Sequence, residues 1–209
     1  LLLAIQPLIS AIAAGNCVIL KPSEVSSNTS AVIAKMINDN FLPEYISVIL
    51  GDVEKTTEIL ENKFDKIFFT GSTSVGKIIQ KKAAETLTPT VLELGGKSPC
   101  VITKSANLEI AAKRITFGKF VNAGQTCIAP DFIWIDESIK DDFLIILKRT
   151  IIDFYGNEIE SNPDFPRVIN NKQFLRLEKY LDNGKLYFGG KSDSNTNYIE
   201  PTILDEISF

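Results

Sequence analysis

The sequence contains no histidine, and this absence excludes several kinds of active site. Without imidazole, the chain cannot build the serine–histidine–aspartate or cysteine–histidine groups that activate many nucleophiles. It also cannot offer histidine ligands to a metal ion. A reactive thiol or hydroxyl in this chain therefore needs another activating group.

Cysteine is scarce as well, with only Cys17, Cys100 and Cys127, far apart along the chain. No C-x-x-C pair occurs, which argues against a zinc site and against a disulfide framework. Free thiols are typical of a reducing compartment, so we expect an intracellular, cytoplasmic protein. Cys17 and Cys100 lie in apolar segments and are predicted to be buried structural thiols. Cys127 lies in a polar turn and needs a separate explanation.

Positive charge is not in excess: 22 Lys and Arg against 26 Asp and Glu give a net charge of −4. This balance disfavours a nucleic-acid partner. The opening "LLLAIQPLISAIAAGN" has no basic region before it, unlike a signal peptide, and is too short to span a membrane. The chain starts without methionine, and its last residues, "IEPTILDEISF", read as a continuing element. We therefore expect a piece of a longer protein.

The first half alternates between two hydrophobic patterns. Short runs rich in β-branched and aromatic residues occupy 17–21, 46–50 and 66–70, and amphipathic helical patterns occupy 29–40 and 53–62. Strands that alternate with helices at this spacing predict βαβ units and a parallel sheet. Because the strands are apolar throughout, helices are expected to cover both faces of that sheet.

The second half begins near a Gly-Gly pair at 95–96, which we take as the junction between two domains, 1–95 and 96–209. The elements expected around and after it are strands at 90–94, 99–103 and 132–136, helices at 108–120 and 139–154, and a helix, turn and strand within 174–190. The sequence thus predicts a second α/β domain.

The stretch "FFTGSTSVGK", residues 68–77, predicts a strand, a glycine-bounded loop and a helix start. Backbone N–H groups at such a helix start favour a phosphate. A plain turn with Ser72 or Thr73 as helix cap would explain the same residues. The spacing also approaches a P-loop, but Ile78 occupies the position of the magnesium-binding hydroxyl.

Two further motifs carry charged side chains. "LKPSE" places Lys21 and Glu24 after the first predicted strand, where open α/β sheets bind ligands. Both could hydrogen-bond ribose hydroxyls, or both could be solvated charges of a surface turn. "LELGGKSP" places Glu93 between two leucines, which suits either a partly desolvated general base or a solvent-facing residue of an alternating strand.

Cys127 follows the polar turn of "VNAGQTCIAP". Backbone N–H groups in the Gly-Gln-Thr segment before it could stabilise a thiolate and face a developing oxyanion. A thiol in this setting is typical of a nucleophile rather than of a packed core.

Taken in order, "LKPSE", "FTGSTSVGK", "LELGGKSPCVI" and "NAGQTCIAPD" resemble the aldehyde dehydrogenase superfamily, from about Gln6 to the end of the chain. "QPLISAIAAGN" and "ITFGKFVNAGQTC" are most similar to its class 3 branch, the fatty and aromatic aldehyde dehydrogenases. The resemblance implies a parallel, Rossmann-like cofactor-binding sheet in residues 1–95. It also implies that residues 96–209 start the α/β catalytic domain.

The resemblance further implies roles for individual residues. Cys127 matches the nucleophile that forms a thiohemiacetal and then a thioester, and Glu93 matches the base that activates the hydrolytic water. The residues matching contacts to NAD or NADP are Lys21 and Glu24 at the adenosine ribose, Gly71, Ser72 and Gly76 near the pyrophosphate, and Leu94. The implied partners are a small aldehyde and a second copy of the full-length protein. No metal is implied.

The family's oxyanion-hole asparagine and its nicotinamide-ribose glutamate would lie upstream and downstream of this chain. We therefore expect the chain alone to be inactive.

Three alternatives remain beside hydrolytic aldehyde oxidation. In a CoA-acylating aldehyde dehydrogenase the thioester passes to CoA, but that branch usually lacks a glutamate at the position of Glu93. A P-loop nucleotide hydrolase is disfavoured by Ile78. A non-catalytic binding protein is disfavoured because Cys127 and Glu93 are both present.

Overall fold

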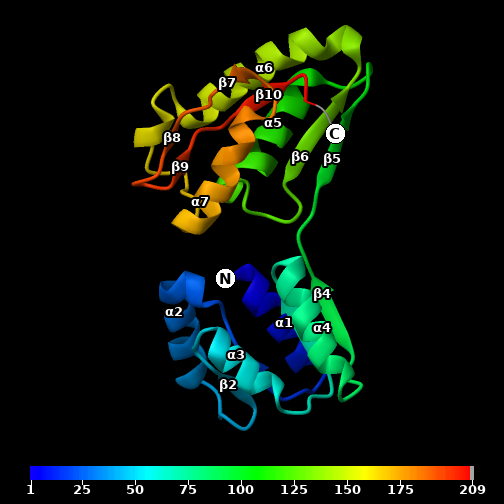
Figure 1. The fold of residues 1–209 in the computed structure, drawn as a ribbon, viewed down its shortest axis with the longest axis vertical. Coiled ribbons are helices and arrows are strands. Elements are labelled where there is room, and N and C mark those ends of the chain that lie inside the picture. The colour runs from blue at the N-terminus through cyan, green and yellow to red at the C-terminus, as the bar shows by residue number, and fades with distance from the viewer. Residues whose placement is uncertain (208–209) are drawn as a thin grey trace. The chain divides into compact units, whose positions relative to one another are not determined.

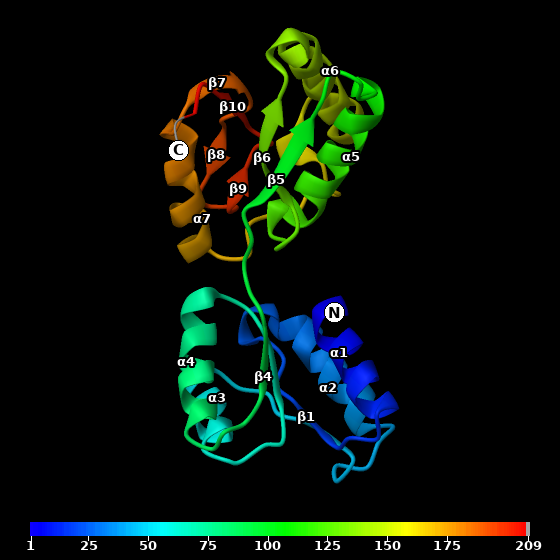
Figure 2. The same ribbon diagram turned by 90° about the vertical axis from the view of Figure 1, so that its right-hand side faces the viewer.

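The computed structural model describes residues 1–207 of the 209. Its internal contacts divide the chain into two compact units, Leu1–Gly95 and Gly96–Phe209, whose elements are labelled in Figures 1 and 2. Both units combine helices with pairs of parallel strands, so the predicted α/β class is confirmed.

The first unit contains two parallel strand pairs. Strand β1 (Val18–Leu20) pairs with β2 (Ile46–Val48), and β3 (Ile67–Thr70) pairs with β4 (Thr90–Glu93). Its helices are α1 (Leu2–Ala13), α2 (Ser27–Asn38), α3 (Val53–Leu60) and α4 (Thr73–Ala84), with a short 3-10 turn, η1 (Glu24–Ser26). In Figure 2, α1 and α2 lie on one side of the strands and α3 and α4 on the other, the two-sided cover expected for apolar strands.

Helix α1 was not among the predicted elements, and it forms from the apolar opening run with Pro7 inside it. It buries Leu8 against Ile33 and Ile37 of α2 and Ile46 of β2. Spacing of four residues puts Ile33 and Ile37 on one face of their helix, which is why both reach this core.

The second unit also starts with a parallel pair, β5 (Ser98–Ile102) with β6 (Pro130–Ile135), connected through α5 (Leu108–Phe120). Helices α5 and α6 (Glu137–Tyr155) pack on one side of this pair, as Figure 2 shows. The remaining elements are α7 (Asn171–Glu178), the antiparallel pairs β7 (Lys185–Phe188) with β10 (Ile203–Asp205) and β8 (Ser192–Asp193) with β9 (Tyr198–Ile199), and the 3-10 turns η2 (Val121–Gly124), η3 (Ile159–Ser161) and η4 (Lys179–Asp182). The final two residues of the expected continuing element lie outside the described part.

Helix caps and an aromatic cluster fix this second unit. The Asn107 side chain accepts a hydrogen bond from the Ile110 N–H at 3.1 Å at the start of α5, which satisfies a donor that the helix leaves unpaired. Phe165 packs edge-on against Tyr155 at 5.1 Å and Tyr198 at 6.1 Å between ring centroids. Phe120, the last residue of α5, packs against Tyr155 and Phe165 in the same cluster. These contacts fix the end of α5, where the loop to Cys127 begins.

The cysteines differ in burial, and one prediction is wrong. Cys17 is exposed, because it precedes β1 rather than lying inside it. Cys100 lies within β5 and is half-buried, and burial raises the pKa of its thiol. In residues 1–207 no helix is long and apolar enough to cross a membrane, and no cluster of three acidic or cysteine side chains could hold a metal ion.

Candidate functional site

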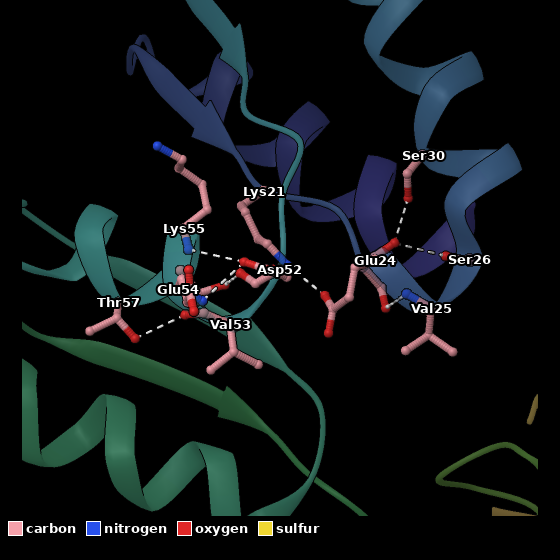
Figure 3. Close-up of polar contacts among 12 residues, drawn as sticks. Lys21, Glu24, Val25, Ser26, Ser30, Asp52, Val53, Glu54, Lys55 and Thr57 are labelled. Carbon is pink, nitrogen blue, oxygen red and sulfur yellow. Dashed lines mark hydrogen bonds and ion pairs between the residues drawn. The ribbon is translucent and has the colours of Figure 1, made fainter. Parts of the chain in front are cut away.

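The predicted ribose contacts, Lys21 and Glu24, form an ion pair just after β1. Lys21 Nζ donates to Glu24 Oε2 at 2.7 Å, and Figure 3 shows the two side chains turned toward each other. This hydrogen bond, followed by one from the backbone N–H of Glu24, lowers the pKa of the Glu24 carboxyl. The Lys21 side chain is 17% exposed and that of Glu24 is 42% exposed. The two charges are therefore ordered against each other rather than separately solvated.

The turn that carries this pair is held by serine side chains. The Ser23 hydroxyl oxygen accepts from the Val25 N–H at 3.3 Å, and the buried Ser30 donates to the Ser23 carbonyl at 2.7 Å. Such local side-chain bonds fix a turn after a strand. They leave Glu24 at the carboxyl end of β1, where parallel α/β sheets bind ligands.

Asp52 belongs to the same edge, and sequence reasoning missed it. It follows β2 and caps α3, because its Oδ1 accepts from the N–H groups of Glu54 at 3.1 Å and Lys55 at 3.4 Å (Figure 3). Its charge opposes the lowering of the Glu24 pKa. An aspartate directly before a helical pattern is a cap signal, so the residue could have been found, although its closeness to Glu24 could not.

The glycine-bounded loop after β3 adopts the capped turn considered above. The Ser72 side chain accepts from the Val75 N–H at 3.3 Å and lies 3.0 Å from the Ser74 hydroxyl. The Gly71 N–H donates to the Glu93 carbonyl at 3.0 Å, which ties the loop to the end of β4. Helix α4 starts directly behind the loop with its positive dipole end, a setting that suits an anion.

Gly76 and Leu94 lie against each other at this helix start. Gly76 is buried, and a Cβ there would lie 2.7 Å from Leu94 Cδ2. A side chain at Gly76 would therefore require the Leu94 side chain to shift. The fold thus brings together four of the predicted cofactor contacts, Gly71, Ser72, Gly76 and Leu94.

Glu93 is the last residue of β4 and is exposed. The three residues before it in β4 are all half-buried, so burial does not alternate along the strand. The side chain of Glu93 is nevertheless solvent-facing, and the partial desolvation that the flanking leucines suggested is not present. Its backbone is nevertheless fixed by the bond to Gly71. An exposed carboxylate on a rigid strand end can still accept a proton from a water molecule.

The loop that carries Cys127 has an unusual backbone. Asn122, Ala123 and Gly124 have φ angles of 57°, 52° and 76°, so three successive residues adopt the left-handed conformation. For a non-glycine residue such as Ala123 this costs about 1–2 kcal/mol. Strain of this kind persists only where the surroundings enforce it, and it is often found at functional sites. Cys127 follows this turn, half-buried, just before β6.

The start of β5 supports Cys127 from its carbonyl side. A Cβ at Gly96 would lie 2.3 Å from the Cys127 carbonyl oxygen, so a side chain at this position would displace the loop. The Ser98 hydroxyl donates to the same oxygen at 3.4 Å. Gly96 was predicted only as a domain junction, and its contact with Cys127 is a finding of the structure.

A cation that sequence reasoning missed also lies beside this loop. A Cβ at Gly124 would lie 3.6 Å from Lys119 Nζ. Burial lowers the pKa of Lys119, Asp131 opposes this shift, and Lys97, which pairs with Asp131 at 3.1 Å, adds to it.

Comparison with known proteins identifies the family. The model of the "Aldehyde dehydrogenase family" matches residues 1–208. The chain is 48% identical to 4,4'-diaponeurosporen-aldehyde dehydrogenase of Staphylococcus aureus, over 99% of this chain and 45% of that protein. It is 50% identical to aldehyde dehydrogenase family 3 member A2 of Pongo abelii (98% and 42%) and 47% identical to the dimeric NADP-preferring aldehyde dehydrogenase of Rattus norvegicus (98% and 45%).

A solved structure agrees. The substrate-bound state of AldH from Staphylococcus aureus superposes with a TM-score of 0.93 at 47% identity, over 98% of this chain and 45% of that one. The chain thus spans less than half the length of the curated relatives it matches. The P-loop alternative is wrong, as Ile78 indicated. This chain belongs to the aldehyde dehydrogenase family.

Proposed function

We propose that the complete protein oxidises an aldehyde to a carboxylic acid with NAD or NADP, through a thioester on Cys127. The observation that carries the proposal is the Cys127 loop, strained at Ala123 and supported at the cysteine carbonyl by Gly96 and Ser98, in a chain of this family. With no histidine in the chain, we propose that backbone N–H groups of the loop before Cys127 help to activate the thiol.

The proposed reaction starts at the sulfur of Cys127. The thiolate attacks the aldehyde carbon and forms a C–S bond, and the carbonyl oxygen becomes an oxyanion that can accept a hydrogen bond from the Cys127 N–H. When that carbon loses hydride, the oxyanion collapses to a carbonyl and a thioester remains. Attack by water then breaks the C–S bond, releases the acid and regenerates the thiolate.

The first unit has features that fit a dinucleotide. Lys21 and Glu24 offer a donor and an acceptor for ribose hydroxyls, and the N–H groups at the start of α4 suit a phosphate. When bound, NAD or NADP would supply the acceptor for hydride. Residues 1–95 would hold it, and residues 96–209 would start the catalytic domain.

Glu93 is proposed to accept the proton of the attacking water. Its exposed carboxylate at the end of β4 can act as a base toward the water that attacks the thioester. Its presence favours hydrolysis over transfer of the acyl group to CoA.

The test of this function uses the complete protein with a medium-chain aldehyde and with benzaldehyde, supplied with NAD or NADP, with and without CoA. We expect reduced nicotinamide and free acid to appear without CoA. Turnover that requires CoA would assign the protein to the acylating alternative. No turnover by a folded protein under any condition would favour the non-catalytic alternative.

Partners and location form part of the proposal. A small aldehyde is the proposed substrate, and a second copy of the full-length protein is the proposed partner, supported by a 47% identical relative that is named dimeric. Three free cysteines support a cytoplasmic location.

Exchanging Glu24 for glutamine is expected to shift cofactor preference toward NADP. A carboxylate at the ribose repels a 2′-phosphate, and removing one charge at such a distance should raise the NADP-to-NAD ratio of kcat/KM about tenfold. Because Lys21 lowers the pKa of Glu24, the carboxylate is ionised across the neutral range, so the shift should not vary with pH there. Glu44→Gln, on an exposed loop of the same unit, is the control. An unchanged ratio in Glu24→Gln would remove Glu24 from the ribose site.

Exchanging Gly96 for alanine is expected to lower kcat about 100-fold, since a displacement of about 1 Å at a reacting group has this effect. The added Cβ would meet the Cys127 carbonyl oxygen, which belongs to backbone and cannot move away alone. Gly118→Ala is the matched control, because its Cβ would lie 3.5 Å from Pro130 Cδ, an ordinary contact. Steady-state kinetics and thermal unfolding of both variants measure the effect. Wild-type kcat in Gly96→Ala would contradict the contact.

A further inference from the structure

The side chain of Gln125, two residues before Cys127, joins the strained loop to a distant segment. Its Nε2 donates to the Arg167 carbonyl at 3.1 Å, and its Oε1 accepts from the Ile169 N–H at 2.9 Å. Within residues 1–207, these are the hydrogen bonds that connect the loop 121–129 to the segment 160–170. The side-chain amide of Gln125 thus connects the two segments with one donated and one accepted hydrogen bond.

The same amide also closes the loop on itself. Gln125 Nε2 donates to the Asn122 carbonyl at 2.9 Å, the Gln125 N–H donates to that carbonyl at 3.1 Å, and Asn122 Nδ2 donates to the Gln125 carbonyl at 3.3 Å. These bonds span the left-handed residues Asn122 to Gly124. A strained turn is kept by interactions of this kind, because they oppose its relaxation to an ordinary backbone conformation.

The segment that receives Gln125 is itself fixed. Arg167 donates to the Phe165 carbonyl at 3.1 Å, and its guanidinium lies 4.8 Å from the ring centroid of the buried Tyr198. Val168 is buried, and its N–H donates to the Asn197 carbonyl at 3.0 Å. The anchor of the loop is therefore part of the core of the second unit.

We infer that Gln125 is a positioning residue for Cys127, acting by fastening the strained 122–124 turn to the Arg167–Ile169 segment. Gly96 and Ser98 contact the carbonyl oxygen of Cys127, and Gln125 holds the backbone that precedes Cys127. The effect on turnover rests on the proposed function, whereas the effect on the reactivity of the thiol does not.

The test compares Gln125→Met with wild type in the complete protein. Methionine keeps the length and shape of the side chain and removes all of its hydrogen bonds. Gln125→Glu keeps the acceptor for the Ile169 N–H and loses the donors. Gln173→Met is the matched control, because the Gln173 side chain accepts a bond from Arg176 on α7, away from the loop.

The first readout is the rate of Cys127 alkylation by iodoacetamide over a series of pH values, followed by mass spectrometry of the Cys127 peptide because Cys17 is also exposed. The others are kcat, KM and thermal unfolding. For Gln125→Met we expect alkylation to slow and kcat to fall about 10- to 100-fold with little change in KM or in the unfolding temperature. Gln125→Glu should lie between Gln125→Met and wild type, and Gln173→Met should match wild type.

Unchanged alkylation and kcat in Gln125→Met would overturn the inference. A loss that only follows the unfolded fraction, or that Gln173→Met shares, would overturn it as well, because it would reveal a purely structural role. Should wild type fail to oxidise aldehydes, the proposed function fails, and the alkylation rates alone then decide the role of Gln125.

Discussion

Replacing Cys127 with serine in the complete protein is expected to lower aldehyde-dependent turnover by at least about 10⁴-fold, as loss of a nucleophile does in other enzymes. Serine keeps the shape of the site, but its hydroxyl is a far weaker nucleophile than a thiolate unless a base removes its proton. No histidine is present in this chain to do so. The absorbance of reduced nicotinamide measures the loss directly.

Cys17→Ser is the matched control for this variant. Cys17 is exposed and lies before β1, in the first unit, so its exchange should leave turnover at the wild-type rate. Substantial turnover by a folded Cys127→Ser protein would show that the thiol is not the nucleophile. Loss of activity in Cys17→Ser would instead point to a thiol in the first unit and contradict the assignment of the nucleophile to Cys127.

Exchanging Glu93 for glutamine is the second large effect. Glutamine has the same shape but cannot accept a proton, so attack by water on the thioester should slow while formation of the thioester continues. We expect steady-state turnover to fall about 10²- to 10⁴-fold, the range typical for loss of a general base. A rapid first phase of about one reduced nicotinamide per Cys127 should remain, because it precedes hydrolysis.

Stopped-flow absorbance separates the two phases, and Glu44→Gln should show wild-type values for both. Loss of the first phase together with the steady state would place Glu93 before the thioester, for example in thiol activation. An unchanged steady state would mean that another group activates the water.

The sequence predicts best where the signal is local. The apolar runs at 46–50 and 66–70 contain β2 and β3, and the amphipathic pattern at 139–154 lies within α6, because alternation and the 3.6-residue period report burial directly. The serine cap of α4 could also be read from neighbouring residues. Helix α1 was not predicted, because its continuous apolar run lacks the polar face of an amphipathic helix and was compared only with membrane and signal segments.

The support of Cys127 could not be predicted in this way. Gly96, two residues before β5, meets the Cys127 carbonyl, 31 positions further along the chain. Gln125 binds a segment more than 40 residues away, with sequence separations of 42 and 44. Neither contact has a periodic signature, and nothing in the residue type reveals that Ala123 is left-handed. Contacts of long sequence separation need the assembled fold.

The most direct measurement of the central claim is mass spectrometry of the Glu93→Gln complete protein mixed with an aldehyde and oxidised cofactor, then acid-quenched and digested. The account predicts an acyl group, of the mass of the aldehyde minus one hydrogen, on the Cys127 peptide in place of the thiol hydrogen. It predicts no acyl group when the oxidised cofactor is omitted. Acylation of Cys17 or Cys100, or formation of the acid with Cys127 unmodified throughout, would contradict it.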